Sequence, residues 1–195
     1  ELREAIRRHR PRHVVLLEAG EWRVARRIES VCQEECVELV WLADPHFYAS
    51  REDFLRHARG RKQLRMEFFY REMRRRQGVL MDGREPAGGN WNFDAANRES
   101  FSLKGPGPVP RPKAFPPDAT TQEVLRLVQR NFPDNPGRLD SFDWPVTPEQ
   151  ASEALDDFIE NRLPLFGRFQ DAMWTAEPWL YHSRLSAAMN LKLLG

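Results

Sequence analysis

Short apolar runs on either side of an amphipathic segment open the chain. Residues 12–19 and 36–42 are continuous apolar runs, which predicts two short, fully buried strands. The segment between them has helical spacing, and its apolar stripe consists of Trp22, Ala25, Ile28 and Cys32. With a further helix predicted over residues 1–10, this order is typical of a parallel sheet covered by helices. We therefore expect part of an α/β layer.

A second amphipathic helix is predicted over residues 64–78, after a shorter helical segment that begins with the capping pair Ser50 and Asp53. The apolar seam of this helix consists of Met66, Phe69, Tyr70 and Met73, and its basic face of Arg65, Arg71, Arg74, Arg75 and Arg76. Gly78 is expected to end the helix. The basic face is either solvated or bound to a phosphate backbone or to an acidic surface of another domain.

Residues 79–118 are predicted to form a long connection, because "LKGPGPVPRPKAFPPD" has too many prolines for a helix or a central strand. Beyond it the pattern is wholly helical. One helix is expected to begin with the capping box Thr120 and Glu123, and another with Thr147 followed by Pro148. The apolar side of the latter consists of Ala151, Ala154, Leu155, Phe158, Ile159 and Arg162. The predicted fold class is therefore α/β followed by all-α.

Composition adds limits on where such a protein works. The 195 residues are 41% hydrophobic and 30% charged, which is an ordinary soluble composition. No apolar run approaches the roughly 20 residues of a membrane helix, so we expect a cytoplasmic monomer without a membrane span. Cys32 and Cys36 are expected to be reduced, packed thiols, since two thiols do not make a tetrahedral metal site. Because the chain begins with Glu1 and stops inside a helical pattern, we expect it to be a piece of a longer protein.

Little catalytic chemistry is visible in the sequence. It contains no nucleophile elbow, glycine-rich phosphate loop or zinc-ligand spacing, so we predict neither a catalytic residue nor a metal ligand. Glu18 and Glu21 could form an acid pair, but carboxylates are favoured near a helix N-terminus in any case.

The stretch "MDGREPAGGNWNFDAANRES" at residues 81–100 is more suggestive. It has the composition of a loop, yet it holds Trp91 and Phe93 beside a flexible glycine pair. Rings that stack on bases and arginines that meet phosphates are the parts of a single-stranded nucleic-acid contact, and Arg98 supplies the charge. Buried aromatic anchors are the other common use of rings in a loop, and composition alone leaves both interpretations open.

Two longer blocks, "LRMEFFYREMRRRQGVLMDGREPAGGNWNFDAANRE" and "FQDAMWTAEPWLYHSRLSAAMNLKLLG", closely resemble the deoxyribodipyrimidine photolyase-related proteins. These are the bacterial branch of the cryptochrome/photolyase superfamily that includes iron–sulfur (6-4) photolyases. "EAGEWRV" and "LPLFGRFQ" fit the same family. The resemblance implies the C-terminal part of a Rossmann-like α/β antenna domain over 1–78, an interdomain connection over 79–118, and the opening helices of a FAD-binding domain over 119–195.

The family's activity implies the cofactors and the partner. The resemblance implies a flavoprotein whose FAD absorbs blue light and passes an electron to a damaged pyrimidine pair in DNA. A lumazine antenna and a [4Fe-4S] cluster accompany the flavin in this family. Such enzymes need a base taken out of the stack, so we expect damaged DNA as the partner and (6-4) photoproducts as the lesion.

The resemblance also implies roles for the loop residues in "WNFDAANR". Asp94 and Arg98 would lie at the lesion end, with Trp91 and Phe93 bracing the loop. Arg98 would pair with a phosphate. Asp94 would orient Arg98 or help to hold a phosphate through a hydrated cation.

"HSRLS" resembles the Thr-Ser-x-Leu-Ser-like turn that begins the flavin site of photolyases, with a histidine in place of the usual threonine. The implied cofactor-binding residues are His182, Ser183, Leu185 and Ser186. Hydroxyls and backbone N–H groups at such a turn suit a diphosphate. Without the family, the simpler interpretation is that Ser183 caps a helix.

Two other functions stay open from the sequence. A cryptochrome-like photoreceptor of the same fold would signal without repairing DNA. A cofactor-free DNA-binding module would depend on salt-sensitive contacts alone. In the family, most of the flavin pocket and the cluster cysteines lie beyond the position of Gly195. We therefore expect the chain by itself to bind neither FAD nor an iron–sulfur cluster strongly and to repair nothing.

Overall fold

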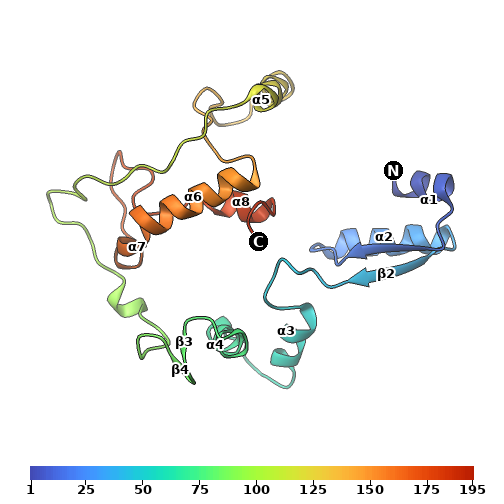
Figure 1. The fold of residues 1–195 in the computed structure, drawn as a ribbon, viewed down its shortest axis with the longest axis horizontal. Coiled ribbons are helices and arrows are strands. Elements are labelled where there is room, and N and C mark those ends of the chain that lie inside the picture. Colours follow the sequence, from blue (N-terminus) through green and yellow to red (C-terminus); the bar gives the residue numbers. More distant parts are fainter. The chain divides into compact units, whose positions relative to one another are not determined.

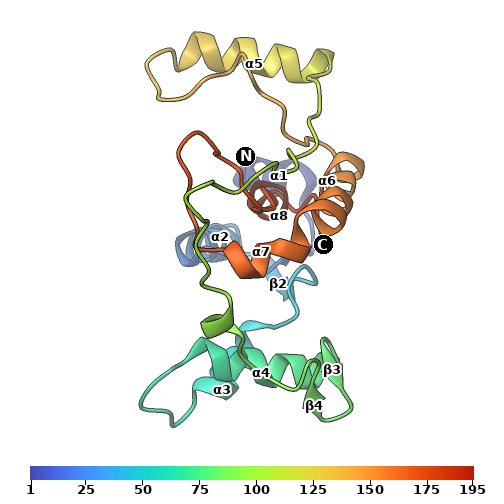
Figure 2. The same cartoon turned by 90° about the vertical axis from the view of Figure 1, so that its left-hand side faces the viewer.

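The computed structural model describes residues 1–195, except for the side chain of Ala96. The chain divides into two compact units, Glu1–Ala87 and Gly88–Gly195. Figures 1 and 2 show the helices and strands of both units from two directions. The division falls inside the predicted connection 79–118, whose boundaries remain a prediction.

The first unit begins with helices on a small parallel sheet, as the apolar pattern predicts (Figure 1). Its first elements are α1 (Leu2–His9), β1 (His13–Leu17), α2 (Trp22–Glu34) and β2 (Glu38–Leu42). β1 and β2 pair in parallel, with Val14 opposite Leu39. Both residues pack against a core formed by Ile6 of α1 and by Val31 and Cys32 of α2. The fold is thus helical around a two-stranded parallel sheet, and the finer Rossmann-like assignment remains a prediction.

The prediction that both strands are fully buried is wrong. Val15, Leu17 and Leu42 are between 45% and 48% exposed. Successive side chains of a strand point to opposite faces, and the core described above meets the face that carries Val14 and Leu39. Trp22 was also expected in the buried stripe of α2, but it is 69% exposed, because it is the first helical residue and precedes the turn that carries the buried Ala25.

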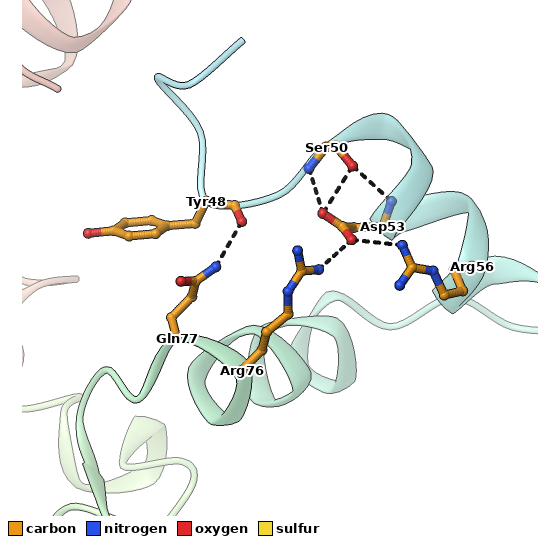
Figure 3. Close-up of polar contacts among 6 residues, drawn as sticks. All are labelled: Tyr48, Ser50, Asp53, Arg56, Arg76 and Gln77. Atoms are coloured by element: carbon orange, nitrogen blue, oxygen red, sulfur yellow. Dashed lines mark hydrogen bonds and ion pairs between the residues drawn. The ribbon is translucent and has the colours of Figure 1, made fainter. Parts of the chain in front are cut away.

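The carboxylate of Asp53 joins the next two helices, α3 (Arg51–Ala58) and α4 (Met66–Gln77). Ser50 and Asp53 form the predicted capping box at the start of α3. The same carboxylate accepts hydrogen bonds from Arg56 of α3 and from Arg76 of α4, as Figure 3 shows. This one buried acid therefore caps a helix and holds its neighbour.

The basic face of α4 is largely engaged within the first unit. Arg74 is only 8% exposed and donates to the carbonyl oxygens of Val79 and Leu80. Arg76 binds Asp53, as described above. The apolar seam is also less covered than its spacing predicts, since Met66 is 67% exposed. The helix ends at Gly78 in the left-handed region, as predicted.

A short antiparallel hairpin, β3 (Met81–Asp82) with β4 (Glu85–Pro86), completes the first unit, and the second unit is helical. Its elements are the short 3-10 helix η1 (Asp94–Ala96), α5 (Ala119–Asn131), α6 (Pro148–Asn161), α7 (Leu163–Phe169) and α8 (Ser186–Asn190). Thr147 caps α6 ahead of Pro148, as predicted. The capping box at Thr120 is wrong: α5 begins at Ala119 and its cap is Asp118, whose side chain accepts the N–H of Thr121 at 2.7 Å.

The apolar side of α6 supplies buried contacts for the second unit. Ala151 and Phe158 are buried, whereas Ile159, predicted on the same side, is 48% exposed. Arg162 ends this side at 1% exposure, and its guanidinium lies 2.7 Å from a carboxylate oxygen of Asp157. Burial opposes the ionisation of Asp157, but hydrogen bonds from Arg162 and from the backbone N–H of Lys113 keep its pKa below the ordinary value.

The proline-rich connection is attached to the helices of the second unit. The N–H of Phe115, a buried residue, donates to the carbonyl oxygen of Asp143 at 3.0 Å. The ammonium group of Lys113 lies 2.6 Å from the carboxylate of Glu153 on α6. Further back, the ring of Phe101 stacks on that of Phe169 at the end of α7, with 4.6 Å between centroids. The connection is therefore attached to the second unit at Phe101, Lys113 and Phe115, while Leu103 between them is fully exposed.

A search of the described residues for a helix long and apolar enough to cross a membrane finds none.

The pKa of Asp53 predicts how the stability of the α3–α4 pair depends on pH. Hydrogen bonds from Arg76 and Ser50 hold this pKa far below its ordinary value. A lowered folded-state pKa stabilises the fold above the unfolded value of about 3.9, and the stabilisation is lost as the pH falls through the folded value. We expect the urea concentration at the unfolding midpoint of the first unit to fall steadily below about pH 4. Unfolding is measured through the NMR signals of residues in α3 and α4.

Asp53→Asn should lower the midpoint at neutral pH and flatten its dependence on pH. Glu52→Gln is the matched control, because Glu52 is an exposed neighbour on the same helical turn. Equal pH profiles for wild type and Asp53→Asn would show that the carboxylate does not hold the two helices.

Candidate functional site

The predicted DNA-binding pair lies in the second unit at η1. Asp94 is the first residue of η1, and its N–H donates to the side-chain oxygen of Asn92 at 2.7 Å. The tight turn brings the side chain of Arg98 against the carboxylate of Asp94, where the two form an ion pair. Both side chains are exposed, at 63% for Arg98 and 48% for Asp94. The structure therefore brings this predicted pair together and leaves it accessible.

The two rings of the same loop differ in their surroundings. Trp91 is half-buried, whereas Phe93 is 46% exposed. The Phe93 ring lies close to Gly88, where an added Cβ would come within 3.2 Å of it. Gly88 also has φ +80, a conformation that favours glycine. The contact between Phe93 and Gly88 fits the bracing role predicted for this ring.

Helix α7 anchors the C-terminal end of the loop. A Cβ added at Gly167 would come within 3.3 Å of the amide of Asn97, so the two residues are in close contact. The next residues form a double link: the carbonyl oxygen of Arg168 accepts the N–H of Glu99 at 3.1 Å, and their side chains form an ion pair at 2.7 Å. Arg98 thus lies between two residues that are fixed to α7.

The predicted flavin turn also contacts α7. The ring of His182 meets the ring of Phe166 edge to face, with 5.7 Å between centroids. His182 and Ser186 are exposed and Ser183 is half-buried, while Leu185 is 7% exposed and supports the turn from inside. The turn therefore offers the imidazole and hydroxyl of two exposed residues, His182 and Ser186, and the hydroxyl of the half-buried Ser183 to a ligand.

The interpretation of Ser183 as a helix cap is wrong. Helix α8 begins at Ser186, and Leu185 occupies its cap position without a side-chain hydrogen bond. The hydroxyl of Ser183 instead accepts the N–H of Leu185 at 3.4 Å, a long contact within the turn. Because α8 has only five residues, a contribution from its dipole to anion binding is small, and the polar groups of the turn itself matter more.

Arg184, in the middle of this turn, is a residue that sequence reasoning missed. Its guanidinium lies between two indole rings, 4.3 Å from the centroid of Trp144 and 4.1 Å from that of Trp179. It also lies 2.8 Å from a carboxylate oxygen of Asp143, and its side chain is only 10% exposed. No local periodicity could reveal a contact between residues about forty positions apart, although the sequence pair Asp143-Trp144 holds the chemistry that an arginine needs.

Arg184 adopts φ +59, the left-handed region that favours glycine. For a residue with a Cβ this conformation costs about 1–2 kcal/mol. A cation–π contact contributes about 0.5–2 kcal/mol, the larger value when the pair is desolvated as here. Two such contacts and a charge-assisted hydrogen bond are therefore enough to offset the backbone strain.

A cluster of aromatic rings lies between the turn at 182–186 and the predicted connection 79–118. Phe169 of α7 stacks on Phe101 and on Tyr181, with the latter centroids 5.8 Å apart. The ring of Trp174 meets Phe101 edge to face at 6.4 Å. Tyr181, the residue before His182, is 6% exposed. The predicted flavin turn thus follows directly after a buried residue of this aromatic cluster.

The described residues contain no group of three or more histidines, cysteines or acids that could hold a metal ion. Cys32 and Cys36 are both free thiols; Cys32 is buried, but Cys36 is exposed, so the prediction of a packed thiol is wrong for Cys36. Burial raises the pKa of the Cys32 thiol, which makes it less reactive. A [4Fe-4S] cluster needs four thiolates, so these two residues do not fit that group.

The comparisons with known proteins identify the family of this chain. A family model described as deoxyribodipyrimidine photo-lyase-related protein matches residues 1–144, and the chain belongs to this family. A curated relative, the (6-4) photolyase of Agrobacterium fabrum, is 42% identical over 196 residues. The alignment covers all of this chain and 38% of the relative's length. The resemblance seen in the two sequence blocks is therefore confirmed, and the turn at 182–186 lies within the aligned part of the relative.

Two glycines of the connection provide a test of its packing. A Cβ at Gly105 would come within 3.0 Å of the Trp174 ring, whereas one at Gly107 would meet nothing within 4 Å. Both glycines have positive φ, +79 and +70. Gly107→Ala should destabilise the second unit by about 1–2 kcal/mol through its backbone alone. Gly105→Ala should add about 1–3 kcal/mol because the methyl group displaces the indole.

Urea denaturation, followed by tryptophan fluorescence, gives the change in the free energy of unfolding for each of the two variants. The prediction concerns the difference between the two variants, since each has the same backbone penalty. If Gly105→Ala and Gly107→Ala are equally stable, the connection does not pack on Trp174.

Proposed function

We propose that the protein carrying this chain is a light-driven DNA-repair enzyme that acts on (6-4) photoproducts through electron transfer from reduced FAD. The observation that carries the proposal is the 42% identity, over the whole chain, to a (6-4) photolyase. The family match over residues 1–144 supports the same class. Damaged DNA is the partner that this activity requires.

We assign the accessible pair at η1 to the DNA. Arg98 would bind a phosphate, since a guanidinium can donate hydrogen bonds to two phosphate oxygens at once. Asp94 would orient the Arg98 side chain for this contact. Trp91 and Phe93 would shape the loop. The support is geometric: the pair is exposed, already formed, and fixed to α7 through Asn97.

We assign the turn at 182–186 to the flavin. His182, Ser183 and Ser186 have accessible polar groups, and Leu185 would contribute through its backbone while its side chain packs inside. These groups fit a phosphate of FAD and are too few to form a whole cofactor site. Bound FAD, once reduced, supplies the electron for repair; the residues of this chain bind and orient it.

The domain organisation follows from the same proposal. Residues 1–78 would belong to the antenna domain, 79–118 to the interdomain connection and 119–195 to the FAD-binding domain. We assign no residue of this chain to a lumazine antenna or to a [4Fe-4S] cluster. By itself the chain would bind FAD weakly and repair nothing; a purified 195-residue chain with stoichiometric flavin absorption would contradict this.

A repair assay on the protein that carries the chain tests the central proposal. Duplex oligonucleotides with one (6-4) photoproduct or one cyclobutane dimer are incubated with the reduced protein under blue light and in the dark. We expect light-dependent loss of the (6-4) lesion and little change in the dimer. Bound flavin without repair of either lesion would instead indicate a photoreceptor.

Removal of the Arg98 side chain tests the DNA contact. Arg98→Ala should weaken binding of lesion DNA roughly three- to tenfold and reduce the salt slope of binding by about one, because one phosphate contact is lost. Arg126→Ala is the control, since Arg126 is an exposed arginine on α5. Titrations at several salt concentrations that give the same slope for Arg98→Ala and wild type would exclude a phosphate contact at Arg98.

A further inference from the structure

We propose that Arg184 is a positioning residue, which fixes the turn at 182–186 for cofactor binding by inserting its guanidinium between Trp144 and Trp179. This inference rests on the proposed function, in which the turn contacts the phosphates of FAD. It concerns a residue at the variable position of the motif, whose side chain points away from the exposed groups of the turn.

The burial pattern of the turn shows why this residue can control it. His182 and Ser186 are exposed, whereas Arg184 between them is 10% exposed at its side chain. The turn therefore has an outer side with polar groups and an inner side held by Arg184 and Leu185. A ligand on the outer side would not contact the guanidinium, so Arg184 acts on it only through the backbone.

The backbone conformation is the means of this action. Arg184 has φ +59, and this left-handed conformation sets how Ser183 and Leu185 are oriented relative to each other. An ordinary residue at this position would favour a negative φ and would turn the two neighbours differently. The sandwich of indole rings and Asp143 selects the observed conformation, because a guanidinium elsewhere would lose both rings and its ion pair.

The partners of Arg184 are themselves fixed. Asp143 accepts the ion pair through its side chain, while its carbonyl oxygen accepts the N–H of the buried Phe115. Trp179 precedes the buried residues Leu180 and Tyr181. The guanidinium therefore holds the turn against the segment before α6 and, through Asp143, against the connection.

The chemistry of the sandwich favours arginine over lysine. A planar guanidinium can lie against two flat rings at once, and it is more weakly hydrated than an ammonium group. Arg184→Lys keeps the charge and loses this plane. Arg184→Gly loses the side chain but adopts positive φ without strain, whereas Arg184→Ala loses the side chain and keeps the strain.

These three variants form the test, made in the protein that carries the chain. The dissociation constants of FAD and of riboflavin, which lacks phosphates, are measured by flavin fluorescence on the apoprotein. Arg184→Ala should weaken FAD binding roughly tenfold, the factor that corresponds to the strain of one left-handed residue. Riboflavin binding should change little. Arg184→Lys should resemble Arg184→Ala, and Arg184→Gly should recover part of the lost FAD affinity.

Arg138→Ala is the control, because its ion pair with Asp140 is exposed at both side chains. Unchanged FAD binding in Arg184→Ala, with FAD bound by the wild type, would overturn the positioning role and leave the proposed function intact. An equal loss of FAD and riboflavin affinity would also overturn it, since that result indicates general destabilisation. A wild-type protein that binds no FAD would overturn the proposed function together with this inference.

Discussion

In our proposal, the shape of the turn at 182–186 depends on one cation held between two indole rings. The guanidinium of Arg184 contacts Trp144, Trp179 and Asp143, which lie in segments outside the helices, before α6 and after α7. These segments contain few backbone hydrogen bonds of their own, so side-chain contacts must determine their path. Without the sandwich, the strained residue at φ +59 would relax, and the turn next to it would lose its shape.

The proposed DNA-binding loop has an exposed ion pair, in contrast to the buried contacts of Arg184. The ion pair between Arg98 and Asp94 is exposed, and exposed pairs contribute only about 0–1 kcal/mol. In the proposed contact, Arg98 would therefore exchange Asp94 for a phosphate at little cost. A buried pair, such as Arg162 with Asp157, is too costly to separate and serves only the fold. Burial thus distinguishes an arginine that can bind a ligand from one that cannot.

Local signals in the sequence predicted the elements well. The capping box of Ser50 with Asp53, the cap at Thr147 and the stop at Gly78 depend on residues within one or two turns of each other. The two strands could be predicted from their own apolar runs, although their parallel pairing joins residues as distant as His13 and Glu38. The errors arose where burial depends on distant partners, as with the exposed faces of the strands and with Trp22. At α5 the carboxylate of Asp118 caps the helix in place of the predicted Thr120, two residues further on.

In the candidate site, too, local contacts could be predicted from the sequence, whereas contacts between distant residues could not. Asp94 and Arg98 are four residues apart, so their pairing could be predicted from the loop itself. Contacts of Arg184 with Trp144, and of Phe101 with Phe169, join residues forty or more positions apart and leave no periodic signal. The family motif marked the neighbours of Arg184 as ligand groups and its own position as variable. A residue that faces inward can still determine what its exposed neighbours present, because the backbone conformation is common to both sides of a turn. Sequence motifs therefore locate a binding turn more readily than they locate the contacts that give it a shape.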